Sequence, residues 1–443
     1  MLGDIYYSLK NKKVLTIFFI LSGVIFQPLL YSNMHFKITY ALMCFTFIMV
    51  NFYALLSSGR VNKVLLLAIF SLIPSFFLGL ILLSNNETTV VDYISDIVRY
   101  IAPFLGFTAA IFLVGKMKSR EVEMLFVLLF SYEILKMLLS IFNKLYAGGD
   151  IVQYLGIAIY SSGILVIVFG FDYFFKGKRT LLSAILLLLS LLVFVMMPFV
   201  IVSKSGILLL VAQSIIIFYL IYKHIRLKIN RFKYFIILFL IALIVPILIG
   251  NNNQTMNRFE QALDVILNNN MHNDSSTSAR TGEITGVLHN FSDTPSGVIF
   301  GIGNGSWILA KYIDEGSGNS NITGLPSENY REKGKYVHHV HSGIFAILNR
   351  NGLIGLLAYF YFFYHVFRLS KKLLNFGHVR FLNFSKESRL VYLYGVGSVV
   401  YLGNIIEILP NNGMYGAIYW GVKAAMIPIV FRYLSLQYKV GKD

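Results

Sequence analysis

Residues 64–83 have the sequence VLLLAIFSLIPSFFLGLILL, a run of twenty residues without a charged side chain. An α-helix of about twenty apolar residues crosses the roughly 30 Å hydrocarbon core of a bilayer. Similar runs recur on both sides of this one along the chain. The sequence therefore predicts an α-helical protein that crosses a membrane many times.

The composition excludes a soluble globular protein. Of the 443 residues, 56% are hydrophobic and only 13% are charged, so a soluble fold would expose more apolar surface than soluble monomers tolerate. The single cysteine, Cys44, falls inside an apolar run. It can form no intramolecular disulfide, and we expect it to pack as a small hydrophobic side chain.

We predict an all-α polytopic protein with about twelve membrane spans in a single integral membrane domain, residues 1–443. The first run follows Lys10, Lys12 and Lys13 and has no small-residue cleavage site after it, so we expect a retained helix rather than a signal peptide. An even number of crossings places both termini on the same side. The predicted spans are 14–31, 36–57, 64–83, 97–115, 122–142, 152–175, 180–201, 206–222, 233–250, 341–367, 388–408 and 414–433.

The basic residues indicate the orientation. The formal net charge is +17, but Lys and Arg stand in short clusters between apolar runs, which argues against a nucleic-acid surface. With both termini in the cytoplasm, about 25 of the 38 Lys and Arg residues fall on the cytoplasmic side, as the positive-inside rule requires. The internal clusters are Arg60/Lys63, Lys116/Lys118/Arg120, Lys176/Lys178/Arg179, Lys223/Arg226/Lys228/Arg231/Lys233 and Arg368/Lys371/Lys372/Arg380/Lys386/Arg389.

One external segment, residues 251–340, is far longer than the others. It has ninety residues, is rich in Asn, Ser and Gly, and carries nine acidic and six basic residues. A loop of this length inside a compact membrane protein is typically functional. Two apolar sets at helical spacing predict short amphipathic helices at the outer membrane face, and a glycine-rich turn follows at 300–305. The two sets are Met256, Phe259, Leu263, Ile266 and Ile284, Val287, Leu288, Phe291.

Three histidines stand where this loop re-enters the membrane. Residues 337–342 have the sequence VHHVHS and contain His338, His339 and His341. Histidine accepts and releases protons near neutral pH, which suits it to general acid–base chemistry. A metal site is one alternative, but no nearby carboxylate or thiol spacing completes a ligand set, so we predict no metal. Capping of the helix that starts near residue 341 is the other alternative.

Arg280 and Lys204 are external cations that suggest anion binding. Arg280 lies in the first turn of a predicted helix, where a cation opposes the helix dipole, so a bound anion would explain its presence. A solvated ion pair with Glu283 is the alternative for Arg280. Lys204 lies in a short hairpin with the sequence VSKSG, residues 202–206, and snorkelling to the interface is its alternative.

Charged residues also fall within or at the edges of predicted spans, where charges are costly and either line cavities or pair with one another. Arg99, Lys136 and Arg350 are cations in such positions. Asp96 stands three residues before Arg99, and Glu133 three before Lys136, so we expect local ion pairs at both places. The sequence contains no P-loop, no dinucleotide-binding fingerprint and no external D-x-D motif, so no nucleotide cofactor is predicted.

The re-entry point resembles a family motif. His341-Ser342 is followed by nine residues and then by GLIG at 352–355, which matches the pattern H-[N/S/Q]-x9-G-x2-[G/T/Y]. This pattern, the late external loop and the span count resemble the bacterial O-antigen polymerase and O-antigen ligase superfamily. Arg280, followed by an F-G-x-G turn at 300–303, is similar to that superfamily as well. Where many members have S-R-G, this chain has SKSG at 203–206, and lysine cannot clamp a phosphate with two donors as arginine can.

The resemblance implies a glycosyltransferase of the GT-C type in the bacterial inner membrane, with its active site facing the periplasm. Its donor would be a glycan on undecaprenyl pyrophosphate. His341 is implied as the catalytic base or as the group that orients the acceptor, and Arg280 and Lys204 as catalytic cations for the departing pyrophosphate. Neither a metal nor another cofactor is implied. The further substrate-binding candidates are His338, His339, Arg258, Arg350 and Arg99.

An O-antigen polymerase, or a related surface-polysaccharide polymerase, is the leading interpretation. Enrichment in Phe, Tyr, Ile, Asn and Lys indicates an A/T-rich gene, which resembles the polymerases more than the ligases. An O-antigen ligase, which transfers the glycan to lipid A core, is the alternative because the motif is shared. A lipid-linked glycan flippase is the alternative of another class, although the absence of a sequence repeat and the long external loop argue against it. A chain-length regulator protein is an expected partner from the resemblance alone.

Overall fold

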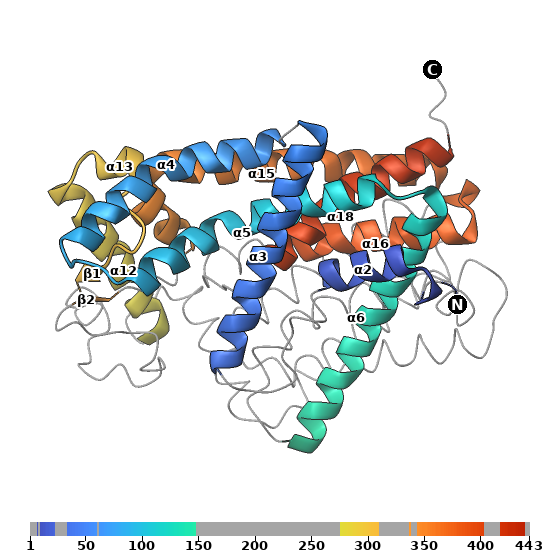
Figure 1. Ribbon diagram of the computed structural model, residues 1–443, viewed down its shortest axis with the longest axis horizontal. Helices are drawn as coiled ribbons and strands as arrows, with labels where there is room; N and C mark the ends of the chain where they lie inside the picture. Colours follow the sequence, from blue (N-terminus) through green and yellow to red (C-terminus); the bar gives the residue numbers. More distant parts are fainter. Residues whose placement is uncertain are drawn as a thin grey trace, which may run out of the picture.

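The structure is a computed structural model that describes residues 7, 9–22, 33–59, 62–147, 275–309, 336–337, 343–402 and 417–438. Helices make up nearly all of these residues (Figure 1). They are α2 (Lys12–Ser22), α3 (Asn33–Ser58), α4 (Lys63–Ser84), α5 (Val90–Gly115), α6 (Ser119–Ala147), α12 (Ser275–Asp293), α13 (Gly297–Phe300), α15 (Gly343–Arg380), η4 (Phe381–Asn383), α16 (Lys386–Leu402) and α18 (Ala417–Gln437). The strands β1 (Ile308–Leu309) and β2 (Tyr336–Val337) form one antiparallel pair.

Several described helices are suited to a membrane. Five stretches are long and apolar enough to cross one: Ala41–Ser58, Lys63–Ser84, Val90–Gly115, Gly343–Gly377 and Ala417–Gln437. Eight of the twelve predicted spans overlap a described helix, namely α2 to α6, α15, α16 and α18. The predicted spans 152–175, 180–201, 206–222 and 233–250, and the predicted amphipathic helix around 256–266, lie outside the described residues. The prediction of a helical membrane protein is confirmed.

Three local features differ from or refine the expectation. The helix predicted from residue 97 begins at Val90, because the Thr89 side chain caps it and accepts a hydrogen bond from the Asp92 N–H at 3.1 Å. The β1–β2 pair adds a small sheet to a chain that was predicted to be all-α. The second predicted amphipathic helix is α12, in which Val287 is buried and Leu288 is exposed.

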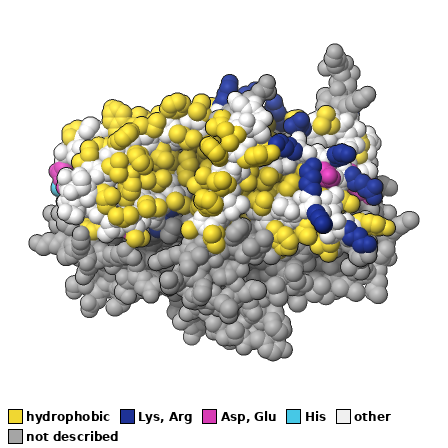
Figure 2. All heavy atoms as spheres, viewed as in Figure 1, with side chains coloured by type: hydrophobic (Ala, Val, Ile, Leu, Met, Phe, Trp, Pro, Cys, Tyr) yellow, Lys and Arg dark blue, Asp and Glu magenta, His cyan; other side chains and the backbone are white. Residues whose placement is uncertain are grey.

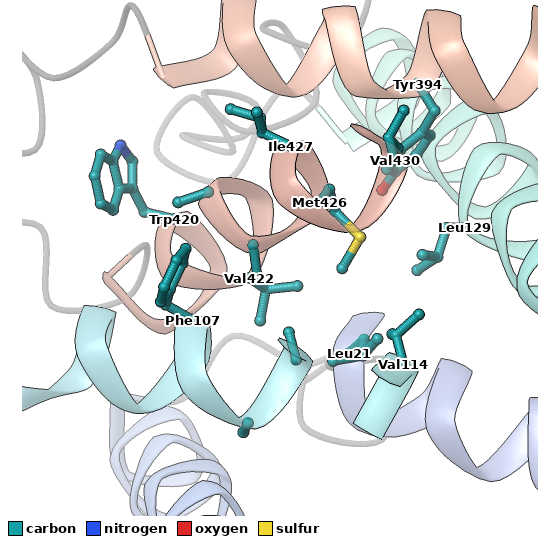
Figure 3. Close-up of a cluster of buried hydrophobic side chains, with 14 of the residues drawn as sticks. Leu21, Phe107, Val114, Leu129, Tyr394, Trp420, Val422, Met426, Ile427 and Val430 are labelled. Atoms are coloured by element: carbon teal, nitrogen blue, oxygen red, sulfur yellow. The ribbon is translucent and has the colours of Figure 1, made fainter. Parts of the chain in front are cut away.

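The helical core is centred on the crossing of α5 and α18. Glycines allow the two backbones to approach: a Cβ on Gly106 would overlap the Ile418 carbonyl, and a Cβ on Gly421 would overlap the Pro103 carbonyl. Small residues at helix crossings serve this purpose in membrane proteins. The rings of Phe362 and Trp420 lie next to the crossing, with centroids 5.4 Å apart. The buried cluster drawn in Figure 3 includes Phe107, Trp420, Val422, Met426 and Val430.

The outer faces of α3, α4 and α15 expose large apolar side chains, which form a broad hydrophobic surface in Figure 2. An apolar surface of this extent indicates contact with lipid. Examples are Phe52 on α3, Phe70 and Phe77 on α4, and Tyr364 and Phe367 on α15.

The two ends of the helical bundle differ in charge. Lys and Arg side chains gather at one end in Figure 2. There, Lys13 pairs with Glu121 at 3.0 Å and donates to the Lys116 carbonyl at 3.0 Å, and Arg380 donates to the Tyr438 carbonyl at 2.9 Å. The segments α12, α13 and β1–β2 of the predicted external loop lie at the opposite end (Figure 1). The described members of the basic clusters that were predicted to be internal therefore lie away from the described parts of the loop.

Candidate functional site

The helix α15 is broken near its N-terminus at Gly352. This residue has φ 62° and ψ −165°, a backbone conformation that favours glycine. A Cβ on Gly352 would also overlap the backbone of Ile299 and of Gly301. Gly352 is the first glycine of the GLIG segment at 352–355, so the structure gives a physical reason for a glycine there. The break separates residues 343–351 from the longer remainder of the helix.

The glycine-rich turn 301–305 packs against this break. Its three glycines have positive φ angles of 81°, 119° and 85°. The N–H of Ile302 donates to the Asn349 carbonyl at 2.7 Å, and the N–H of Gly303 donates to the Arg350 carbonyl at 3.2 Å. An interrupted helix leaves carbonyl groups without intrahelical partners. The turn supplies those partners.

Side chains from α4 and from the α4–α5 connection hold the turn in place. The Ser75 hydroxyl accepts a hydrogen bond from the Asn304 side chain at 3.1 Å and from the Asn351 side chain at 2.6 Å. The Ser75 carbonyl accepts another from the Asn304 N–H at 3.1 Å. Thr88 donates through its hydroxyl to the Gly305 carbonyl at 2.8 Å. One serine therefore joins the turn to the first segment of α15.

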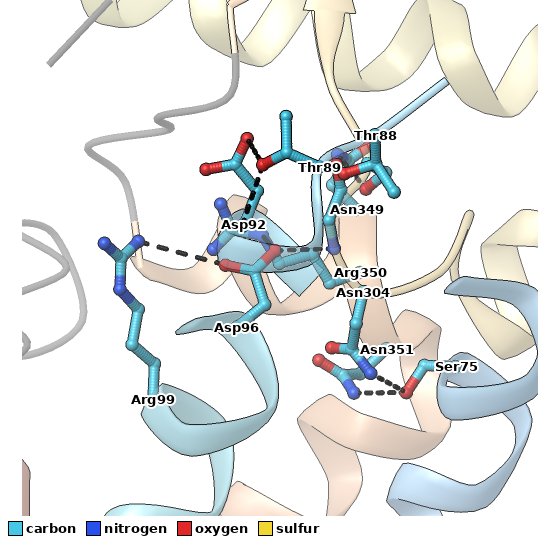
Figure 4. Close-up of polar contacts among 12 residues, drawn as sticks. Ser75, Thr88, Thr89, Asp92, Asp96, Arg99, Asn304, Asn349, Arg350 and Asn351 are labelled. Carbon is cyan, nitrogen blue, oxygen red and sulfur yellow. Dashed lines mark hydrogen bonds and ion pairs between the residues drawn. The ribbon is translucent and has the colours of Figure 1, made fainter. Parts of the chain in front are cut away.

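Asp96 on α5 places a negative charge next to Arg350 (Figure 4). Its Oδ2 atom lies 2.7 Å from Nε of Arg350 and accepts a hydrogen bond from the Gly305 N–H at 2.7 Å. Its Oδ1 atom lies 3.9 Å from Nη1 of Arg99. Asp96 is 1% exposed and Arg350 is 5% exposed. Loss of either charge would leave the other buried without its nearest counter-charge.

The helix α12 is bonded to the same segment of α15. Asn290 donates to Oδ1 of Asn349 at 3.1 Å and to the Trp307 carbonyl at 3.0 Å. Asn349 in turn donates to the Ser306 hydroxyl at 2.9 Å. Glu283, also on α12, is fully buried. The site thus joins four stretches that are far apart in the sequence: α4–α5, α12, the turn and α15.

The structure describes two of the predicted site residues in full. Arg350 is buried against Asp96, and Arg99 lies near the same carboxylate with 14% of its side chain exposed. The backbone of Arg280 belongs to α12, while its side chain lies outside the described atoms. The remaining predicted site residues lie outside the described residues; they are His341, His338, His339, Lys204 and Arg258.

The described residues on either side of the histidine segment adjoin the site. β2 ends at Val337, one residue before His338, and Val337 pairs with Ile308 in β1. The helix α15 begins at Gly343, two residues after His341. Both flanks of the histidine segment are therefore anchored to parts of the chain that contact the turn.

Local spacing did not identify several residues of the buried polar network. Glu133 forms an ion pair with Lys423 from α18. Its predicted pair with Lys136, whose side chain lies outside the described atoms, stays a prediction. A lysine inside the predicted span 414–433 was a signal that this charge needs a buried partner, but it did not indicate which one. Three consecutive polar residues at 349–351, inside another predicted span, were a comparable signal for the site at α15.

Within the part of the chain that the structure describes, no group of three or more His, Cys, Asp or Glu side chains is arranged to hold a metal ion. The His338–His341 cluster lies outside that part. The prediction that this cluster binds no metal therefore stays a prediction.

The helices and the site define a membrane protein in which a loop segment is bonded into a broken helix. A protein-family model described as O-Antigen ligase matches residues 189–360. This match confirms the resemblance to the O-antigen polymerase and ligase superfamily and supports the membership of the chain in it. The matched region contains both site segments, 301–305 and 349–352, and most of the predicted site residues. No curated protein and no solved structure matches the chain.

Proposed function

We propose that the protein is a membrane glycosyltransferase that polymerises undecaprenyl-pyrophosphate-linked repeat units of O-antigen or a related surface polysaccharide. The observation that carries the proposal is the coincidence of two results in one region. The family match covers residues 189–360. Within it, the turn 301–305 is hydrogen-bonded to the carbonyls of Asn349 and Arg350, which lie between His341 and Gly352 of the motif. Two motifs that resemble the superfamily thus belong to one structural unit.

The proposed transfer needs a base and cations. The acceptor hydroxyl loses its proton to His341 while its oxygen attacks the anomeric carbon, and the bond from that carbon to the pyrophosphate oxygen breaks. Lys204 and Arg280 stabilise the negative charge on the departing undecaprenyl pyrophosphate. A single displacement of this kind inverts the anomeric configuration, and it needs no cofactor.

Apart from Arg350, the remaining predicted cations and histidines would contact the substrate around this centre. Among them, Arg99 has a described side chain, which lies beside Asp96 and is partly exposed. His338, His339 and Arg258 belong to the proposal on sequence grounds.

The proposed topology has about twelve spans of the GT-C type, with both termini in the cytoplasm of a bacterium and the long loop in the periplasm. The separation of the basic end of the bundle from the described loop segments supports this orientation. A chain-length regulator is the proposed protein partner.

The description of the matching family model favours an O-antigen ligase as the second candidate. Polymerase and ligase share the donor and differ in the acceptor, which is another lipid-linked glycan for the polymerase and lipid A core for the ligase. A flippase has less support because the matched family consists of glycosyltransferase-like enzymes.

The decisive test supplies purified full-length protein with undecaprenyl-pyrophosphate-linked repeat unit as the sole substrate. We expect wild-type protein to form a ladder of product lengths with or without a chelator, and folded His341→Ala to form none. Transfer that requires added lipid A core would identify the ligase. Inactivity under both conditions in folded wild-type protein would contradict the enzyme and favour a transporter.

A further inference from the structure

The two arginines beside Asp96 differ in their surroundings. The Arg350 side chain is 6% exposed and its Nε atom lies 2.7 Å from the carboxylate, whereas the Arg99 side chain is 14% exposed and lies 3.9 Å away. A phosphate that approached Arg350 would meet the negative charge of Asp96, which repels it. Burial and this carboxylate both argue against a direct contact between Arg350 and a lipid pyrophosphate.

Arg350 and its neighbours are bonded to the turn, to α4 and α5, and, through the Asn349 side chain, to Asn290 on α12 and to Ser306. The Asn349 and Arg350 carbonyls accept from the turn, the Asn351 side chain donates to Ser75, and the Arg350 guanidinium faces Asp96. Because Gly352 interrupts the helix, regular helical bonding does not fix the orientation of residues 343–351. These side bonds fix it. We call the set the turn latch; its members are Ser75, Thr88, Asp96, the turn 301–305 and residues 349–352.

We propose that the turn latch, through the Asp96–Arg350 ion pair, positions the chain that enters α15 for the transfer reaction. The proposal rests on the proposed function. His341 stands two residues before the segment that the latch holds. The position of that segment therefore fixes one end of the stretch that carries His341. A base must lie within hydrogen-bond reach of its proton, and a displacement of about 1 Å can slow a reaction about 100-fold. Arg350 is thus a positioning residue rather than a substrate ligand.

Kinetics separate positioning from binding. Asp96→Asn keeps the size of the side chain and an oxygen for the Gly305 N–H, but it removes the charge that faces Arg350. In the full-length protein, we expect kcat per folded molecule to fall about 100-fold while Kd for the lipid-linked donor changes less than about 3-fold. Arg350→Lys keeps a cation beside Asp96 and should retain more of the rate than Arg350→Gln.

A distance measurement tests the latch without turnover. Ile344 lies before the break and is 37% exposed, and Leu357 lies after it and is 55% exposed. Spin labels on Ile344→Cys and Leu357→Cys, with the buried Cys44 replaced by alanine, report the geometry across Gly352. We expect one narrow distance distribution in the otherwise wild-type protein, and a shifted or broadened one with Asp96→Asn.

Glu133→Gln is the matched control because it removes one charge of another buried ion pair, whose polar partners are on helices. It should lower thermal stability but leave the distance distribution and the turnover per folded molecule unchanged. A weakened donor Kd with normal kcat in the Arg350 variants would overturn the proposal in favour of substrate contact. Unchanged distance and rate in Asp96→Asn would overturn it in favour of a purely structural pair. Wild-type protein without turnover would contradict the proposed function, and the distances would still decide whether the latch exists.

Discussion

Within the described residues, two buried ion pairs each join a helix from the N-terminal part of the chain to one from the C-terminal part. The two pairs have different neighbours. Asp96 and Arg350 meet beside the turn 301–305, and the carboxylate also accepts the Gly305 N–H. Glu133 and Lys423 meet between α6 and α18, and the Glu133 carboxylate also accepts hydrogen bonds from Tyr394 at 3.1 Å and Tyr419 at 3.0 Å. One pair has a loop backbone as its third partner, and the other has phenol groups.

The neighbours of each ion pair determine what the pair can do. Glu133 lies fourteen residues into α6, about 21 Å along the helix from its start at Ser119, so its ion pair determines how α6 packs against α18 inside the bundle. Apolar side chains of similar size can replace a pair of this kind. The Asp96 pair satisfies a backbone N–H in a strained glycine turn and holds a helix break, and apolar side chains cannot replace those bonds. The Glu133 pair therefore specifies helix packing, whereas the Asp96 pair positions a loop.

The largest effect is expected from Glu133→Leu. This change leaves Lys423 buried without its counter-charge, which costs about 3–5 kcal/mol of folding free energy. The measurement is thermal unfolding of the purified protein in detergent micelles. A loss well below about 1 kcal/mol would show that Lys423 finds another partner or reaches water, and that the pair does not specify the helix match.

Paired substitutions should change the stability differently at the two ion pairs. In Glu133→Leu/Lys423→Met, we expect most of the lost stability to return, because replacing a buried ion pair by apolar side chains is often neutral or stabilising. In Asp96→Leu/Arg350→Met, we expect no such return, because the Gly305 N–H loses its acceptor. Equal recovery at both sites would show that the two ion pairs have the same structural role.

The next largest effect is expected from Gly352→Ala. Alanine at φ 62° carries backbone strain of about 1–3 kcal/mol, and its Cβ would overlap the backbone of Ile299 and Gly301. The turn must then move from α15. Hydrogen exchange measured by mass spectrometry should show faster exchange at the N–H groups of Ile302 and Gly303, which donate to α15 in the native structure.

Gly115→Ala is the matched control for this glycine. Gly115 ends α5, its φ is not positive, and a Cβ there would meet no atom within 4 Å. We expect its stability to change by less than about 1 kcal/mol and exchange in the turn to stay as in the wild type. If Gly115→Ala and Gly352→Ala accelerate exchange equally, the break in α15 does not depend on glycine at residue 352.

The membrane helices were predictable from the sequence because the property that forms them is local. A run such as 64–83 has to be helical to satisfy its own backbone in lipid, whatever its neighbours are. The apolar spacing of Ile284, Val287 and Phe291 predicted α12 for the same reason, since helical periodicity is visible within a few turns. The family motif likewise identified residues 352–355 from the sequence alone, because its residues lie close together in the chain.

The site geometry was not predictable because its partners are distant in the sequence. The spacing of Asp96 and Arg99 suggested a local pair, yet the shorter contact of Asp96 is to Arg350, more than 250 residues further along. Glu133 and Lys423 repeat this pattern. The break at Gly352 depends on the turn 301–305, which lies about 50 residues before it and is not part of the α15 sequence. A single sequence shows that such charges must find partners, and the tertiary fold decides which ones.

The smallest expected effect belongs to an exposed ion pair that serves as the reference for both buried ones. Glu121 accepts a hydrogen bond from the Lys118 N–H at 2.8 Å and another from Lys13 at 3.0 Å, and these lower the pKa of its carboxyl below the ordinary value of 4.5. A lowered folded-state pKa stabilises the protein above the ordinary value, and the contribution disappears as the pH falls from about 4.5 through the lower folded pKa. Because Lys13 is 46% exposed, Glu121→Gln should cost less than about 1 kcal/mol at pH 7. Thermal unfolding of both proteins from pH 7 to pH 3 should show their difference shrinking with acid, and a difference that grows would contradict this assignment.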